Sequence, residues 1–128
     1  MNYNILYLIA ELPAPLIILA LSALIWKNPP RQSENVGYRT KRSQSSEQAW
    51  LYAQITYGKL STIVFVVFTA LTVMVGIIGI LKRFDEGTGF AVFIAQNCVL
   101  VALLFVIVIA VENKLKAAFD EHGEPKGR

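Results

Sequence analysis

The order of apolar and polar residues divides the chain into three long apolar runs separated by polar stretches. The runs cover Ile5–Trp26, Leu60–Leu81 and Phe90–Val111, and each has 22 residues. As helices they would each be roughly 33 Å long, enough to cross the hydrocarbon core of a bilayer. The first run contains one charged residue, Glu11, and the other two contain none. The pattern predicts an all-α membrane protein with three transmembrane helices in a single domain, residues 1–128.

Composition agrees with this prediction. Hydrophobic residues make up 55% of the chain, charged residues 16%, and the mean hydropathy is +0.50, values typical of small polytopic membrane proteins and outside the usual range of soluble domains. The first run does not resemble a cleaved signal peptide, because no cationic segment precedes it and it is longer than the apolar core of such peptides. We therefore expect it to be retained as a helix.

The distribution of Lys and Arg predicts the orientation. The segment between the first two runs (27–59) carries six of these residues, the tail (112–128) carries four, and the short link 82–89 carries two. Three spans place the first segment and the tail on the same side of the membrane. By the positive-inside rule, the N-terminus is then outside, and 27–59 and 112–128 are a cytoplasmic loop and a cytoplasmic tail.

The second half of this loop has the pattern of a helix start. Pro29–Pro30 disfavours a helix in the first half. Ser45 and Gln48 have the spacing of a capping box, and Ser46 is a competing N-cap. The stretch that follows either lies in the membrane interface as a short amphipathic helix, the arrangement adopted in our fold prediction, or runs straight into the second span.

The loop also contains a polar and aromatic pattern that is more specific than a topology anchor requires. It reads Asn35, Gly37-Tyr38-Arg39-Thr40, a serine-rich step at 43–46, Trp50, Ala53-Gln54 and Gly58. This pattern resembles the signature of the SdpI-like family of bacterial membrane proteins, except that the family has Asn where this chain has Gln54. The tail is similar to the family's ending, with Glu112, Phe119, Asp120 and Gly123 in the matching positions.

The resemblance implies a function. The founding member of the family is longer, confers immunity to a secreted membrane-active killing peptide, and tethers a transcriptional repressor when it senses the toxin. For this chain the resemblance therefore implies a multi-pass protein of the bacterial cell membrane that acts in toxin resistance or signalling. Its expected partners are membrane lipids, a membrane-active peptide toxin and a cytoplasmic regulator.

The residue types in the loop are suited to binding. Gly37 can adopt positive φ, and Arg39 offers a planar fork of donors for a carboxylate or a phosphate. Glu112 lies where the third span meets the same face, so Arg39 pairs either with Glu112 or with a lipid phosphate. The predicted partner-binding site comprises Asn35, Gly37, Tyr38, Arg39, Thr40, Trp50, Gln54 and Glu112. The alternative is a simple anchor, with basic residues at lipid headgroups and aromatic residues at the interface.

A second polar group is expected inside the membrane. Glu11 lies at a depth similar to that of Gln96 and Asn97, and Thr72 lies in the same half of the second span. Thr72 and Gly76 also have the small-xxx-small spacing that allows helices to approach closely. Two interpretations stay open: a protonated Glu11 joined to an amide as a link between helices, or a pocket open to the outer leaflet that meets a ligand or an inserting peptide.

Other chemistry finds little support in the sequence. It contains no His/Cys/Asp/Glu cluster with metal spacing, no glycine-rich phosphate loop and no convergent Ser/His/acid set, so we predict no metal, no cofactor and no nucleic-acid partner. We predict a binding protein of the immunity or sensing type, and not an enzyme. The alternative is a lipid- or small-molecule-binding or transport component, acting as a homo-oligomer or as an accessory subunit of a membrane complex, because three helices enclose little volume. Catalysis by Glu11 or Glu112 is the least favoured hypothesis.

Overall fold

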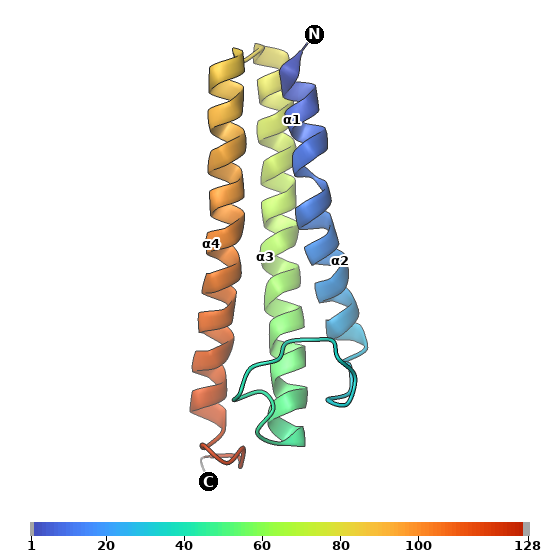
Figure 1. Cartoon of the computed structure of the whole chain (residues 1–128), viewed down its shortest axis with the longest axis vertical. Coiled ribbons are helices and arrows are strands. Elements are labelled where there is room, and N and C mark those ends of the chain that lie inside the picture. Colours follow the sequence, from blue (N-terminus) through green and yellow to red (C-terminus); the bar gives the residue numbers. More distant parts are fainter. Residues whose placement is uncertain (1, 127–128) are drawn as a thin grey trace.

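The computed structural model describes residues 2–126 as a bundle of long helices. In chain order these are α1 (Tyr3–Glu11), α2 (Pro13–Lys27), α3 (Glu47–Lys82) and α4 (Glu86–Ala118) (Figure 1). The first two form one apolar segment, and this segment, α3 and α4 are each long and apolar enough to cross a membrane. The predicted all-α class with three such helices is confirmed.

The break between α1 and α2 falls at Leu12, before the two prolines of the first apolar run. Pro13 and Pro15 have no N–H, so they cannot continue the helical hydrogen-bond ladder. Leu12 nevertheless keeps a right-handed helical backbone and donates to the Leu8 carbonyl at 3.2 Å. The prolines therefore interrupt the ladder without ending the span.

The helix that starts in the loop is continuous with the second span. α3 begins at Glu47 and runs without interruption to Lys82, and the loop 28–46 has no helix of its own. Its N-cap is Ser46, whose hydroxyl accepts the Ala49 N–H at 3.0 Å, so the competing cap is used and not Ser45. Of the two arrangements that the sequence left open, the structure contains the continuous helix.

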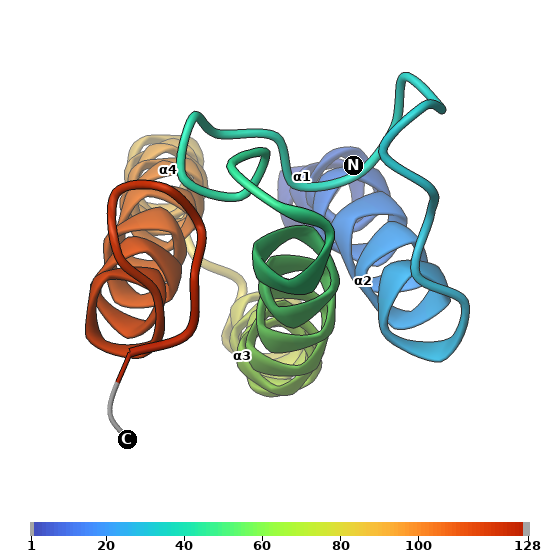
Figure 2. The same cartoon turned by 90° about the horizontal axis from the view of Figure 1, so that it is seen from below.

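α3 is the central element of the bundle. Viewed along the bundle from the end that carries the long loop, α3 lies between α2 and α4 (Figure 2). We call this end the loop end, and the end with the N-terminus and the short α3–α4 connection the turn end. The C-terminal tail folds back at the loop end, beside the start of α3 (Figure 1).

Small residues bring the first apolar segment close to α3. A Cβ atom at Gly58 would lie 2.7 Å from the Trp26 backbone nitrogen, and one at Gly76 would lie 2.5 Å from Leu8. Between these two sites, the buried hydroxyls of Ser22 and Ser61 are 2.7 Å apart and share a hydrogen bond. The close approach expected at Gly76 is confirmed, and Gly58 adds a second one nearer the loop end.

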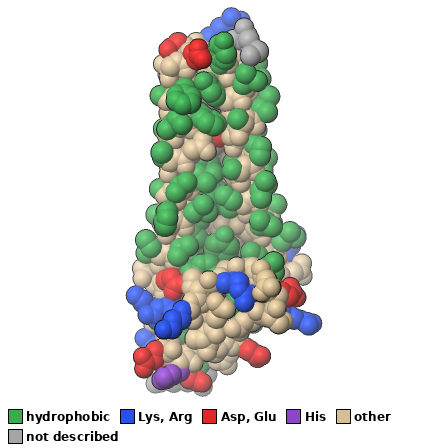
Figure 3. Space-filling view, viewed as in Figure 1, with side chains coloured by type: hydrophobic (Ala, Val, Ile, Leu, Met, Phe, Trp, Pro, Cys, Tyr) green, Lys and Arg blue, Asp and Glu red, His purple; other side chains and the backbone are tan. Residues whose placement is uncertain are grey.

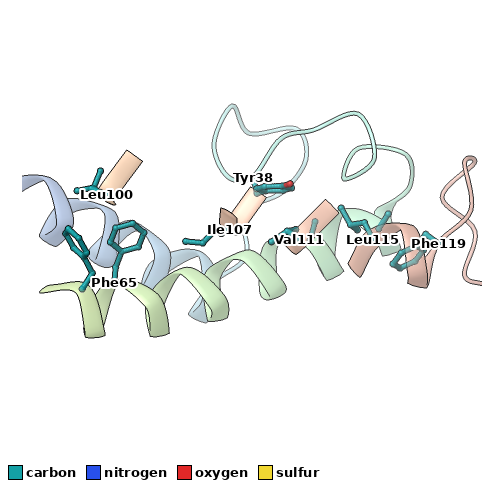
Figure 4. Packing of buried hydrophobic residues seen from close by; sticks show 10 residues of the cluster. Tyr38, Phe65, Leu100, Ile107, Val111, Leu115 and Phe119 are labelled. Carbon is teal, nitrogen blue, oxygen red and sulfur yellow. The ribbon is translucent and has the colours of Figure 1, made fainter. Parts of the chain in front are cut away.

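The buried core follows the contact between α3 and α4. Figure 4 shows it extending from Phe65 and Leu100 to Phe119, with Tyr38 entering from the loop. Most other large apolar side chains are exposed along the middle of the bundle, whereas charged residues gather at its two ends (Figure 3). An apolar middle with charged ends is the surface expected of a protein that spans a bilayer.

The cations that predict the orientation lie mainly at the loop end, where Lys and Arg are visible in Figure 3. Arg128, one of the cations counted in the tail, is outside the described residues. The inside location of the loop end follows from the positive-inside rule and stays a prediction.

The close approach at Gly58 leads to a prediction about stability. Replacing Gly58 by Ala places a methyl group against the Trp26 backbone, which cannot rotate away as a side chain could. We expect Gly58→Ala to reduce the free energy of unfolding by about 1–3 kcal/mol, measured by thermal unfolding in detergent.

Gly87→Ala is the matched control. Gly87 is exposed in the first turn of α4, and its added Cβ would meet only the Asp85 side chain, at 3.3 Å. It should be neutral or slightly stabilising, because Ala loses less backbone entropy than Gly on folding. Equal stability of the two variants would contradict the proposed backbone contact.

Candidate functional site at the loop end

The loop is held to the bundle by two hydrogen bonds between one side-chain amide and the backbone of one loop residue. Gln54 lies fully buried on α3, and its Oε1 accepts the Tyr38 backbone N–H at 2.8 Å. Its Nε2 donates to the Tyr38 carbonyl at 2.7 Å. One amide therefore satisfies both polar backbone groups of a buried residue, as a neighbouring β-strand would.

Gly37 is required by the same contact. Its φ of +100° lies in the region that favours glycine. A Cβ atom there would lie 2.5 Å from the Gln54 Oε1 and 2.8 Å from the Pro30 ring. Gly37 is thus needed for its backbone conformation and for the space that it leaves to Gln54.

The Tyr38 side chain crosses to α4. Its hydroxyl donates to the Glu112 Oε1 at 2.8 Å, and its ring stacks on Tyr57 with centroids 5.2 Å apart. Burial raises the pKa of the Tyr38 phenol, and the adjacent Glu112 carboxylate raises it further. The hydroxyl therefore stays protonated and acts as a donor, and this single residue joins the loop to both α3 and α4.

The Arg39 side chain points away from Glu112 and stabilises the loop itself. Its guanidinium donates to the carbonyls of Gln32 (3.0 Å) and Glu34 (2.5 Å), and it lies 5.0 Å from the Trp50 ring centroid. The Trp50 indole donates in turn to the Pro30 carbonyl at 2.7 Å.

The hypothesis that Arg39 pairs with Glu112 is therefore wrong. Tyr38 occupies the side of the loop that faces Glu112, so the next side chain projects to the other side, over Trp50. Within residues 2–126, the ion pair of Glu112 is with Arg42, whose Nε is 3.8 Å from Oε2, and it is partly exposed. Such pairs contribute little stability.

The serine-rich step forms a turn with Thr40. The Ser43 hydroxyl accepts the Thr40 N–H at 2.8 Å, and the Ser43 N–H donates to the Thr40 hydroxyl at 3.2 Å. Ser43 is fully buried, a role that the sequence did not assign to it individually. The reciprocal Thr-x-x-Ser spacing was the signal that could have identified it. Asn35, in contrast, is exposed and lies outside this network.

The tail completes the loop end. Ser46 donates to the Gly123 carbonyl at 2.7 Å, and Gly123 has a φ of +78°. The Asp120 carboxylate accepts the N–H groups of His122 and Glu124, both at 2.9 Å, and the Glu124 N–H above all lowers the pKa of Asp120. Phe119 packs edge-on against Tyr52. Residues 119–124 therefore build a turn that rests on the start of α3.

The structure brings together only part of the polar group expected inside the membrane. Glu11 is 6% exposed, and the Gln96 amide, oriented so that its nitrogen faces the carboxylate, donates to Oε1 at 2.9 Å. Asn97 instead donates to the Phe93 carbonyl of its own helix at 2.8 Å. Thr72 is buried but does not line the cavity beside Glu11. The expected cluster thus reduces to the Glu11–Gln96 link.

Asn4 was not expected at this site. It is buried and donates to the Phe84 carbonyl at 3.0 Å, and with Glu11 and Gln96 it lines a cavity of about 20 Å³. This volume has room for one water molecule. Asn4 precedes the first apolar run, so a search restricted to the run could not find it.

A hollow at the loop end lies beneath the loop, between α2 and α4. It has a volume of about 970 Å³ and is lined by residues of α2, the loop, Tyr57 of α3 and Val108 of α4. We call it the sub-loop cleft. Among residues 2–126, no group of three or more His, Cys, Asp or Glu side chains is placed to hold a metal ion.

These features define a multi-pass membrane protein whose long loop is folded onto one end of its bundle. The model of the SdpI/YfhL protein family matches residues 31–111, which is more than half of the chain. The chain therefore belongs to the SdpI/YfhL family, and the resemblance seen in the sequence is confirmed. The matched segment includes Gly37, Tyr38 and Gln54. No curated protein and no solved structure matches the chain.

The Gln54 contact with the Tyr38 backbone predicts a large effect of an apolar substitution. Gln54→Leu has a similar size but leaves the buried Tyr38 N–H without its partner, and leaves the Tyr38 carbonyl with only the Ser43 hydroxyl, at 3.3 Å. We expect it to lower the free energy of unfolding by about 2–4 kcal/mol, measured by denaturant titration in detergent. Gln48→Leu, on the exposed face of the same helix, is the control and should change stability by less than about 0.5 kcal/mol. Equal effects would show that the amide contributes nothing specific.

The contacts of Glu112 can be separated by double-mutant cycles. Tyr38→Phe and Glu112→Gln should be coupled by about 1–2 kcal/mol, because the pair shares a charge-assisted hydrogen bond. Arg39→Gln and Glu112→Gln should be additive within about 0.5 kcal/mol, since these side chains do not touch. Coupling of Arg39, and none of Tyr38, would restore the pairing that the structure rejects.

Proposed function

We propose that this protein protects a bacterial cell against a membrane-active peptide toxin, and that it does so by binding rather than by catalysis. The family to which the chain belongs suggests an immunity-type function. The protein would act in the cell membrane, with its loop end in the cytoplasm.

The observation that carries this proposal is the folded state of the loop. Tyr38, Gln54 and Glu112 join the loop, α3 and α4 through hydrogen bonds of 2.7–2.8 Å. Buried and mutually bonded groups of this kind hold a surface in one conformation, which lowers the entropy lost when a partner binds. The polar groups of the family motif are engaged with one another. The motif therefore supports a preorganised binding surface.

The Glu11–Gln96 link supports a second point of contact at the turn end. It lies between apolar helices beside the buried amide of Asn4, and intramembrane carboxylates are functional candidates by default. A peptide that inserts from outside would meet this end first if the N-terminus is outside, as the charge distribution predicts.

A protection assay tests the proposal. The chain is expressed in a bacterium that is sensitive to membrane-active peptides, and the cells are challenged with a broad panel of them. We expect survival to rise at least about tenfold for one peptide or one class, because protection by binding is selective. Survival is counted as colonies, and the amount of protein in the membrane fraction is measured in parallel. Unchanged killing across the panel overturns the proposal.

Variants then show which end of the bundle contacts the toxin. Glu11→Gln keeps an amide-compatible shape, so it should preserve protection if this carboxyl is neutral and only links helices. Loss of protection at normal protein levels would assign the toxin contact to the turn end. Gln48→Leu serves as the control on the exposed face of α3.

A further inference from the structure

The sub-loop cleft has the form of a slot for a long apolar chain. One wall is a stripe of α2 that includes Leu21 and Leu24, which are 56% and 58% exposed. Val108 of α4 forms the opposite side, and Tyr57 of α3 lies behind them. α3 separates α2 and α4 at this end of the bundle (Figure 2), and the cleft is lined by residues of all three helices and of the loop.

The rim of the cleft is polar and offers donors that the protein does not use. Asn28, Arg31 and Asn35 all lie on this rim and are exposed. Within residues 2–126, the Arg31 guanidinium makes no hydrogen bond or ion pair with another residue. Arg39, the other cation of the rim, is already bound to loop carbonyls. Arg31 is therefore the guanidinium available to a ligand, and Glu34 is the one carboxylate that lines the cleft beside it.

We propose that the sub-loop cleft binds one phospholipid, with its phosphate at Arg31 and an acyl chain between α2 and α4. The volume of about 970 Å³ lies at the upper end of the range for small-molecule sites. A guanidinium binds phosphate through two parallel charge-assisted hydrogen bonds, and the amides of Asn28 and Asn35 can donate to the same group. The site goes beyond the proposed function, since it would exist whether or not the chain confers immunity.

The position of the polar rim favours a phospholipid over a peptide. α2 ends at Lys27, so the rim lies where an apolar span meets the headgroup region of the bilayer. A phospholipid already present in the leaflet brings its phosphate to this level and its acyl chain to the level of Leu21. An apolar peptide helix would fill the slot but would leave Arg31 without an anion.

Photolabelling tests the assignment. The full chain is placed in nanodiscs of phosphatidylcholine that contain a small fraction of phosphatidylglycerol with a photoreactive group in one acyl chain. After illumination, labelled residues are identified by mass spectrometry of proteolytic fragments. We expect the label to concentrate on the cleft, at Leu21, Leu24 and Val108. An even distribution over the exposed apolar faces of α2, α3 and α4 overturns the proposal.

Two pairs of variants test the two halves of the site. Arg31→Gln should reduce cleft labelling about tenfold, because it removes a charge-assisted bond to phosphate. Lys59→Gln removes an exposed cation of the same end outside the cleft and should leave labelling unchanged. Val108→Trp should block the slot, whereas Ile109→Trp, on the next residue and outside the cleft lining, should not.

Two further outcomes would show that the sub-loop cleft does not bind a phospholipid at Arg31. If Arg31→Gln and Lys59→Gln reduce labelling equally, the phosphate is not held at Arg31 and the proposal fails. If a photoreactive membrane-active peptide labels Leu21 and Val108 but the phospholipid does not, the cleft is a peptide site. Both results can be obtained with protein that protects cells and with protein that does not, so they are separate from the test of immunity.

Discussion

The loop end depends on the pairing of one side-chain amide with the backbone of one residue. The Gln54 amide bonds to both the N–H and the carbonyl of Tyr38. These groups are buried, so water cannot take the place of the Gln54 amide. Without Gln54 the Tyr38 N–H would be unpaired and the carbonyl would keep only the Ser43 hydroxyl, at 3.3 Å, and a buried unpaired N–H costs more than most single contacts contribute. Once this contact is made, Tyr38 is placed to reach Glu112, and Arg39 is placed over Trp50. A polar loop between two spans thereby becomes a folded part of the bundle.

This constraint also explains the residue types around it. Gly37 is needed because any side chain there would collide with the Gln54 amide, and because its φ is positive. The tail rests on the α3 N-terminus, so that α3 and α4 are joined at the loop end by the loop and by the tail. The contacts that hold the loop therefore come from both α3 and α4, which suits a surface that presents one conformation to a partner or to the membrane.

The two ends of the bundle use polar groups differently. At the turn end a single carboxyl, Glu11, is buried against Gln96 beside a cavity of about 20 Å³. At the loop end the polar groups bond to one another and leave a cleft of about 970 Å³ below them. The membrane would lie between, along the exposed apolar side chains. A small bundle can thus offer two distinct sites without a large core, since most of its apolar surface faces lipid.

The helical class, the three apolar segments and the motif that identifies the family could all be predicted from the sequence. These depend on hydropathy and local residue pattern, which are readable along the chain. The sequence also indicated that Gly37, Tyr38, Gln54 and Glu112 belong together. That Glu112 bonds to Tyr38 and not to Arg39, and that Asn97 lies outside the Glu11 site, became known from the folded structure alone. The reason is that spacing shows which residues share a face or a depth, whereas side-chain direction depends on how loop and helices pack.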